Sequence, residues 1–286
     1  MLFRNAKVLP EDAHKGINAW LIYLALPAVS FKYLPHIHWT KNLLLPAIAP
    51  IIAWAGSWIW MKIYAQKATL TKATAGGLRI TAGLSNTSFI GFPLIMAYFG
   101  EKELSIAIIC DQVNFTLLST AGVIVAISSS GSHSLSASTI AKKLLKFPPF
   151  IACVLALTLP RFVDISFFDP FFSSLAATVA PLALFSIGLQ LKFRGWRGEW
   201  KHISIALLYK LILAPALVLA VAVALNIKGT IAQISIFEAA MPTLLTAAIV
   251  TEEYELNPVL VNLVIGIGII VAFATTGLWF LLIKNL

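Results

Sequence analysis

The stretch GLSNTSFIGFPL, residues 83–94, is a polar interruption in an otherwise strongly apolar part of the chain. It carries four consecutive polar residues, Ser85 to Ser88, followed by the helix-loosening residues Gly91 and Pro93. A helix broken inside a membrane exposes backbone N–H and C=O groups that lipid cannot satisfy, so a break persists only where protein or a water-filled cavity covers it. The stretch therefore predicts an interrupted helix beside a polar site.

The composition places the rest of the chain in a lipid bilayer. Of its 286 residues, 59% are hydrophobic and 12% are charged, and the mean hydropathy is +0.88, whereas soluble domains carry about 25% charged residues. The apolar residues form blocks of the length that crosses a membrane as a helix. We expect an all-α polytopic membrane protein with nine spans: Ile17–Leu34, Leu43–Tyr64, Ala73–Phe99, Ser105–Ser128, Phe147–Phe162, Phe171–Leu191, Ile203–Asn226, Ile231–Thr251 and Pro258–Ile283.

The distribution of cations predicts the orientation. Of 21 lysines and arginines, thirteen lie at block ends on one side and six lie at the opposite ends. Cytoplasmic loops carry the excess of positive charge, which puts the N-terminus in the cytoplasm and the C-terminus outside. This bias also accounts for the net charge of +9, so we expect no nucleic-acid partner. A multi-pass protein of the plasma membrane, the inner membrane in a bacterium, is the predicted location.

A serine-rich connector divides the chain into two similar sets of blocks. The predicted segments are an N-terminal cytoplasmic segment at 1–16, a first repeat of four spans at 17–128, the connector at 129–146 and a second repeat of five spans at 147–286. LALPAVSF (24–31) in the first set corresponds to APLALFSIG (180–188) in the second, and the broken GLSNTSFIGFP corresponds to FEAAMPT (237–243). Interrupted helices at matching positions of two halves point to a transporter binding site.

Two such breaks facing each other would aim helix N-termini, which carry partial positive charge, at one central point. This arrangement favours an anion site. The alternative is a pair of proline kinks that serve only packing, because proline and glycine are common in membrane-spanning helices.

Two carboxylates inside the blocks are candidates for ion coupling. Glu238 stands immediately before the break AAMPT and is predicted to bind a coupling cation or proton; the alternative is a hydrogen-bonded packing residue. Asp111 begins the run DQVNF, which places Gln112 and Asn114 within one helical turn. This run can line a polar cavity or make simple hydrogen bonds between helices.

The cations inside the blocks are Arg79 and Lys210. Both are predicted to lie toward the cytoplasmic ends of their helices, where long side chains extend to the membrane surface. Enzyme signatures are missing from the sequence, which has no HExxH, no GxSxG, no phosphate-binding glycine loop and no spaced Cys/His cluster. We therefore expect no enzyme, and no cofactor other than a sodium ion or proton used for coupling.

The segments SNTSFIGFPL, APLALFSIGLQL and FEAAMPT, the last followed by EEYELNPVLVNLVIGIG, resemble the auxin efflux carrier family, which includes plant PIN carriers and bacterial malonate or malate permease-like members. The resemblance runs from LPEDAHKGINAW to the C-terminus. It implies two inverted repeats, as in sodium/proton antiporters and bile-acid symporters, with two crossed broken helices and elevator-like transport. The family normally has ten helices, and its first precedes LFRNAKVLPEDA, so we expect either a trimmed start or a nine-span variant.

The resemblance also assigns residues. Asn86 matches an asparagine that contacts the substrate carboxylate in plant relatives, and Ser30 matches a serine of the pocket. Gln112, or Asp111 if the alignment slips by one, matches a polar pocket residue. Glu238 stands where plant relatives tend to carry glutamine, and a carboxylate there suits proton or sodium binding. Two prolines, Pro93 and Pro242, match those of the crossing.

The favoured hypothesis is a secondary carrier of a small organic anion, with a carboxylate as the expected class and a homodimer as a candidate assembly. The alternatives are a sodium-coupled symporter of a bulkier amphipathic anion and a membrane receptor that does not transport. The predicted substrate-binding residues are Asn86, Ser30, Thr87, Gln112, Asn114 and Thr243; the helix-crossing residues are Gly91, Pro93, Met241 and Pro242; the coupling residues are Glu238 and Asp111, with Glu238 as the ligand of any sodium ion.

Overall fold

The computed structural model describes residues 10, 12–36, 40–130, 145–190 and 196–286, and these residues form helices and no strands. Most of the predicted N-terminal segment and of the serine-rich connector lies outside the described residues. Within these described ranges, six helices are long and apolar enough to cross a membrane: Ala13–His36, Lys41–Lys67, Glu101–Ser130, Ser166–Leu189, Gly198–Ala224 and Pro258–Ile283. The chain is therefore built as a multi-pass membrane protein.

The other three predicted spans differ from these six helices. The block at 147–162 forms a short apolar helix, Pro148–Arg161. The blocks at 73–99 and 231–251 are both interrupted, and their halves are separate helices. The count of nine spans and the inverted repeat remain predictions.

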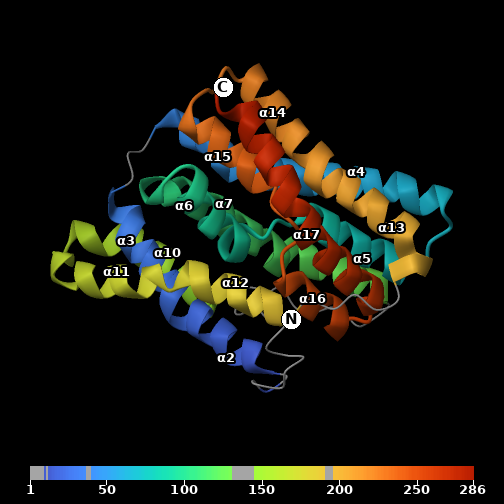
Figure 1. Cartoon of the computed structure of the whole chain (residues 1–286), viewed down its shortest axis with the longest axis horizontal. Coiled ribbons are helices and arrows are strands. Elements are labelled where there is room, and N and C mark those ends of the chain that lie inside the picture. The colour runs from blue at the N-terminus through green and yellow to red at the C-terminus, as the bar shows by residue number, and fades with distance from the viewer. Residues whose placement is uncertain (1–9, 11, 37–39, 131–144, 191–195) are drawn as a thin grey trace.

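The helices group into two bundles that do not follow the two halves of the sequence (Figure 1). The small bundle brings the first span against the fifth and sixth. Its helices are α2 (Ala13–Trp20), α3 (Leu26–Tyr33), α10 (Pro148–Thr158), α11 (Asp169–Ala177) and α12 (Val179–Gln190).

The large bundle contains the remaining described helices, with α4 packed against both halves of the chain. Its members are α4 (Leu44–Lys67), α5 (Lys72–Gly83), α6 (Phe92–Tyr98), α7 (Leu104–Leu117), α8 (Val123–Ser130), α13 (Trp196–Leu208), α14 (Ala214–Ala224), α15 (Thr230–Ala239), α16 (Thr246–Glu253) and α17 (Pro258–Ile283). Helices α6, α7 and α12 lie where the bundles meet (Figure 1).

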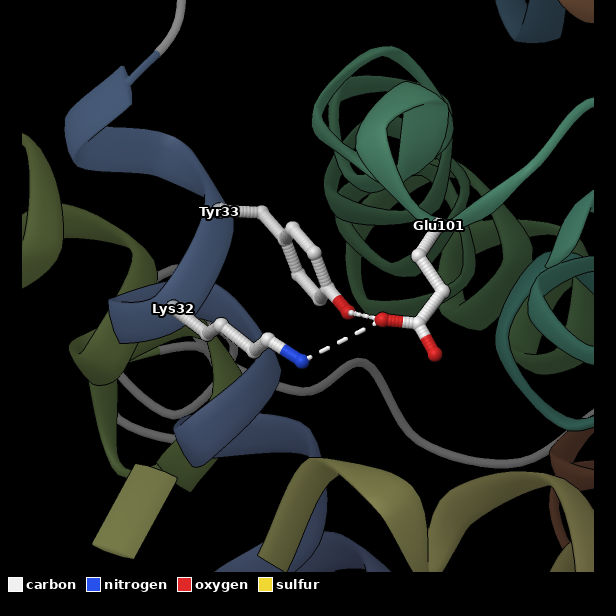
Figure 2. Close-up of polar contacts among 3 residues, drawn as sticks. All are labelled: Lys32, Tyr33 and Glu101. Carbon is white, nitrogen blue, oxygen red and sulfur yellow. Dashed lines mark hydrogen bonds and ion pairs between the residues drawn. The ribbon is translucent and has the colours of Figure 1, made fainter. Parts of the chain in front are cut away.

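A polar contact also joins the bundles at one end. Figure 2 shows Lys32 and Tyr33 of α3 converging on Glu101, in the turn that precedes α7. The Lys32 ammonium and the Tyr33 hydroxyl donate to the same Glu101 oxygen, Oε2, at 3.4 and 3.2 Å. Because Glu101 is 64% exposed, this contact has the character of a surface ion pair and adds little stability.

The two breaks are where the polypeptide departs most from regular helix. After α5 ends at Gly83, the chain is extended at Leu84, and a π-helical turn, Thr87–Gly91, leads into α6. The second break separates α15 from α16. Residues Ser85 and Thr243 pair as an antiparallel bridge.

Two backbone hydrogen bonds flank this bridge: Asn86 N–H donates to the Pro242 carbonyl at 2.7 Å, and Leu244 N–H donates to the Leu84 carbonyl at 3.2 Å. Each break thus satisfies backbone groups of the other, and protein rather than lipid covers both. The breaks lie against each other, as expected from their matching positions in the sequence.

Candidate functional site

Asn86 begins the second half of the first broken helix. Its side-chain Oδ1 accepts from Phe89 N–H at 3.2 Å and so caps the helix Thr87–Tyr98. The residue is 0% exposed, yet its Nδ2 has no hydrogen-bond partner among the described residues. Buried amide donors are nearly always bonded. An N–H donor held at a helix N-terminus is suited to an anionic oxygen.

Helix α7 supplies the polar groups that hold the first break. The Thr87 hydroxyl donates to Asp111 Oδ1 at 2.6 Å. Asn114 accepts from Ser85 N–H through Oδ1, and its Nδ2 donates to the Cys110 carbonyl, both at 3.3 Å. Asp111 and Asn114 are buried. Their side chains hold the irregular segment through these bonds and also line a pocket.

Glu238, near the end of α15, is 1% exposed, and neither carboxylate oxygen has a partner within the described chain. It faces Gly91, and a Cβ atom added to Gly91 would lie 2.8 Å from Glu238 Oε1 and 2.9 Å from its Cδ. Only glycine lets the first broken helix approach this carboxylate so closely. The residues that line the small cavity beside it are Ala49, Pro50, Ser85, Cys110, Asn114, Ser235, Glu238 and Ala239.

The oxygens around this cavity are hard donors of the kind that bind sodium, and the same carboxylate can take a proton. The residues present therefore fit either a sodium ion or a proton. Among the described residues, no group of three or more His, Cys, Asp or Glu side chains is placed to hold a metal ion, so a sodium ion here would rely on one carboxylate and neutral oxygens.

Lys210 lies between the two breaks. Its side chain is 0% exposed, and Nζ donates to Ser85 Oγ at 2.7 Å and to the Ala239 carbonyl at 2.8 Å. The prediction that this lysine extends to the membrane surface is wrong, because its nitrogen is bonded inside the large bundle. Arg79, the other cation of the blocks, is partly exposed and stacks over the Trp58 ring at 5.7 Å.

A second pocket lies between the two bundles. It combines apolar side chains with four polar ones from α7 and the two breaks. The ring of Phe115, on α7, stacks on the ring of Phe147, which directly precedes α10. Their centroids are 3.4 Å apart. The lining residues are Ile22, Leu26, Ser88, Phe89, Asp111, Asn114, Phe115, Phe147, Leu244 and Thr246.

The remaining predicted site residues have these positions. Ser30, on α3, donates to the Leu26 carbonyl at 3.4 Å and lies one turn beyond the second pocket. Thr243 is fully buried and donates to the Thr81 carbonyl at 2.7 Å. Gln112 is half-buried and lines neither pocket; its Oε1 lacks a partner in the part of the chain that the structure describes. Three crossing residues, Pro93, Met241 and Pro242, are buried.

The structure thus brings Asn86, Thr87, Asp111, Asn114 and Glu238 around the paired breaks. It adds residues that the sequence analysis did not select: Lys210, Ser85, Ser235 and the pocket phenylalanines. A signal for Lys210 was present, because it lies as far beyond the start of its predicted block as Glu238 does.

Comparison with known proteins places this arrangement in a family. A family model described as membrane transport protein matches residues 1–280. An uncharacterized transporter of Methanothermobacter thermautotrophicus is 24% identical over 275 residues, which cover 95% of this chain and 90% of the relative. An uncharacterized transporter of Methanocaldococcus jannaschii is 26% identical over 287 residues, covering 97% and 92%.

Auxin efflux carrier component 8 of Arabidopsis thaliana is 29% identical over 104 residues, which cover 36% of this chain and 28% of the plant protein. The match of the family model spans nearly all the residues of this chain, including both breaks. This chain therefore belongs to the auxin efflux carrier-like family of membrane transport proteins.

Proposed function

We propose that this protein is a secondary active carrier of a small organic anion, with a carboxylate as the expected class. The observation that carries the proposal is the Asn86 amide: Nδ2 is buried at a helix N-terminus with no partner among the described residues. A substrate carboxylate would accept from this donor. The positive end of the helix Thr87–Tyr98 would add to the attraction.

The second pocket supports an anion that also carries an apolar part. Phenylalanine and aliphatic side chains supply most of its lining, and the polar groups are Ser88, Asp111, Asn114 and Thr246. Ligand pockets commonly combine a few polar groups with a mainly apolar wall. This lining also suits the bulkier amphipathic anion of the second candidate better than a very small dicarboxylate.

Coupling is assigned to Glu238 and Asp111. Glu238 is the buried carboxylate whose oxygens have no partner in the described structure, and Asp111 is a second buried carboxylate, bonded to Thr87 of the first break. A proton or a sodium ion bound at Glu238 would remove the cost of an isolated buried charge. Binding of the ion and of the anion at adjacent positions would then favour each other.

The division into two bundles supports elevator-type alternating access. The pocket takes Ile22 and Leu26 from the small bundle and the polar residues from the large bundle. Sliding of one bundle against the other would carry the site across the membrane while the paired breaks stay intact. The proposal includes nine spans in inverted repeats, a homodimer, and a plasma membrane location with a cytoplasmic N-terminus and an external C-terminus.

The test begins with a screen of mono- and dicarboxylates for thermal stabilisation of the purified protein, with and without sodium and at two pH values. A ligand at 100 times its Kd stabilises the folded state by about 2.7 kcal/mol. Flux of each stabilising carboxylate is then measured in proteoliposomes. Stabilisation without flux would indicate a receptor rather than a carrier.

The decisive variant is Asn86→Asp, because aspartate keeps the capping oxygen and replaces the amide donor with a negative oxygen. Asn257→Asp is the matched control: Asn257 caps α17 by accepting from Leu260 N–H at 3.3 Å. We expect Asn86→Asp to abolish binding and flux while Asn257→Asp retains both. Unchanged binding by Asn86→Asp would refute the assignment of the anion site, and unchanged flux by Glu238→Gln would refute the coupling assignment.

A further inference from the structure

One buried cation bridges the two breaks. Lys210 belongs to a π-helical turn, Tyr209–Leu213, that joins α13 to α14. Its Nζ reaches Ser85 Oγ in the first break and the Ala239 carbonyl at the second, at 2.7 and 2.8 Å. Both partners are neutral oxygens. Lys210 makes no hydrogen bond to Glu238, whose oxygens lack partners within the described residues.

The Ala239 carbonyl that accepts from Lys210 lies at the end of a half-helix. Ala239 is the last residue of α15, so its carbonyl lies at the negative end of a half-helix and lacks a bond from a following turn. In carriers built on broken helices, such half-helix C-terminal ends and unwound carbonyls are the groups that coordinate the coupling cation. Here the cation at that position is covalently part of the chain.

We propose that Lys210 is a tethered cation that replaces a bound sodium ion between the two breaks, so that the carrier works without sodium. The consequence of this inference rests on the proposed carrier function. Because Lys210 takes the place of sodium, a proton at Glu238 is the coupling ion. Lys210 donates to the carbonyl of Ala239, the residue that follows Glu238 in the chain, and so its charge balances part of the negative charge that Glu238 and a bound anion bring to the site.

Sodium alone is the probe that tests the inference. The melting temperature of the purified full-length protein is measured in sodium chloride and in choline chloride at equal ionic strength. We expect the same melting temperature for the wild-type protein in both salts. The variant Lys210→Ser removes the tethered cation, leaves the Ser85 and Ala239 oxygens in place and adds a hydroxyl. It should melt roughly 5 °C lower in choline chloride, and sodium should restore part of the loss in a saturable manner.

Lys228→Ser is the matched control, because Lys228 is exposed; it should melt like the wild-type protein in both salts. Lys210→Arg, which keeps a cation, should remain insensitive to sodium. A merely structural lysine would lower the melting temperature of Lys210→Ser without creating a response to sodium, and that result overturns the inference.

A saturable, sodium-specific stabilisation of the wild-type protein also overturns the inference, and this measurement decides the question even where Lys210→Ser does not fold. No organic anion enters these experiments, so their outcome is independent of the carboxylate screen. A sodium-dependent carboxylate carrier would refute the role of Lys210 and leave the proposed function standing. Failure of every carboxylate to bind would refute the proposed substrate class and leave the sodium measurements valid.

Discussion

Replacement of Gly91 by alanine tests the close approach between the first break and Glu238. A Cβ atom at this position would lie 2.8 Å from Glu238 Oε1 and 2.9 Å from Cδ, and closer still to Oε2. Non-bonded carbon and oxygen atoms do not tolerate these separations. Either the carboxylate or the helix must therefore move. Both residues are buried, so the carboxylate can move only within the small cavity beside it.

Overpacking of a closely packed interior costs about 1–3 kcal/mol. Against this cost stands a gain of roughly 0.5–1 kcal/mol when alanine replaces glycine inside a helix. We therefore expect Gly91→Ala to change the stability by a net loss of about 0–2.5 kcal/mol. Gly16→Ala is the matched control: Gly16 lies in α2 with nothing within 4 Å of an added Cβ, so this variant should show only the gain.

The free energy of unfolding is measured by titration with sodium dodecyl sulfate in mixed micelles, followed by tryptophan fluorescence. The double variant Gly91→Ala/Glu238→Ala adds a sharper condition. Removal of the carboxylate makes room for the new methyl group, so the cost of Gly91→Ala should fall by about 1 kcal/mol or more in this background. Equal effects of Gly91→Ala in both backgrounds, or a gain like that at Gly16, would refute the packing described for this site.

Three further predictions concern single polar contacts and use the same unfolding assay. Thr87→Val removes the buried donor to Asp111 Oδ1 and should cost about 1–3 kcal/mol; a neutral effect would contradict the bond. Tyr209→Phe removes a 2.6 Å bond to the Ala53 carbonyl and should cost about 0.6–1.5 kcal/mol, whereas a stabilising effect would show that the hydroxyl is not needed there. The pair Lys32–Glu101, studied by a double-mutant cycle with glutamine, should show a coupling below about 1 kcal/mol because it is partly exposed; a larger coupling would mean that this contact holds the two bundles together.

The position of the candidate site at the two breaks could be predicted because polar residues are rare in a bilayer, whereas the roles of its residues stay predictions. The run from Ser85 to Ser88 and the carboxylate of Glu238 stand out against an apolar background, and each had to be covered by protein or water. The structure places them together and in the interior. The prediction for Lys210 is wrong because a long side chain at this depth can either extend to the membrane surface or turn inward, and only the packing selects between the two. Its partner Ser85 lies 125 residues away in the chain.

The chain order also hides the grouping of the helices. The small bundle joins α2 and α3, from the start of the chain, to α10, α11 and α12, from beyond the connector. The second pocket depends on this grouping, because Ile22 and Phe147 reach it from the small-bundle side and Phe89 and Phe115 from the large bundle. No periodicity along one helix could have brought these side chains together.

The amino-acid sequence by itself determined that this chain is a helical membrane protein with two polar interruptions, since hydrophobicity, helix length and helix-breaking residues are local properties. Only the tertiary structure decided what the interruptions contact. The pairing of Ser85 with Thr243, the approach of Gly91 to Glu238 and the bridge made by Lys210 all join segments distant in the chain. Backbone groups that lipid cannot satisfy must find partners somewhere in the protein, and packing of the whole bundle determines which partners they find.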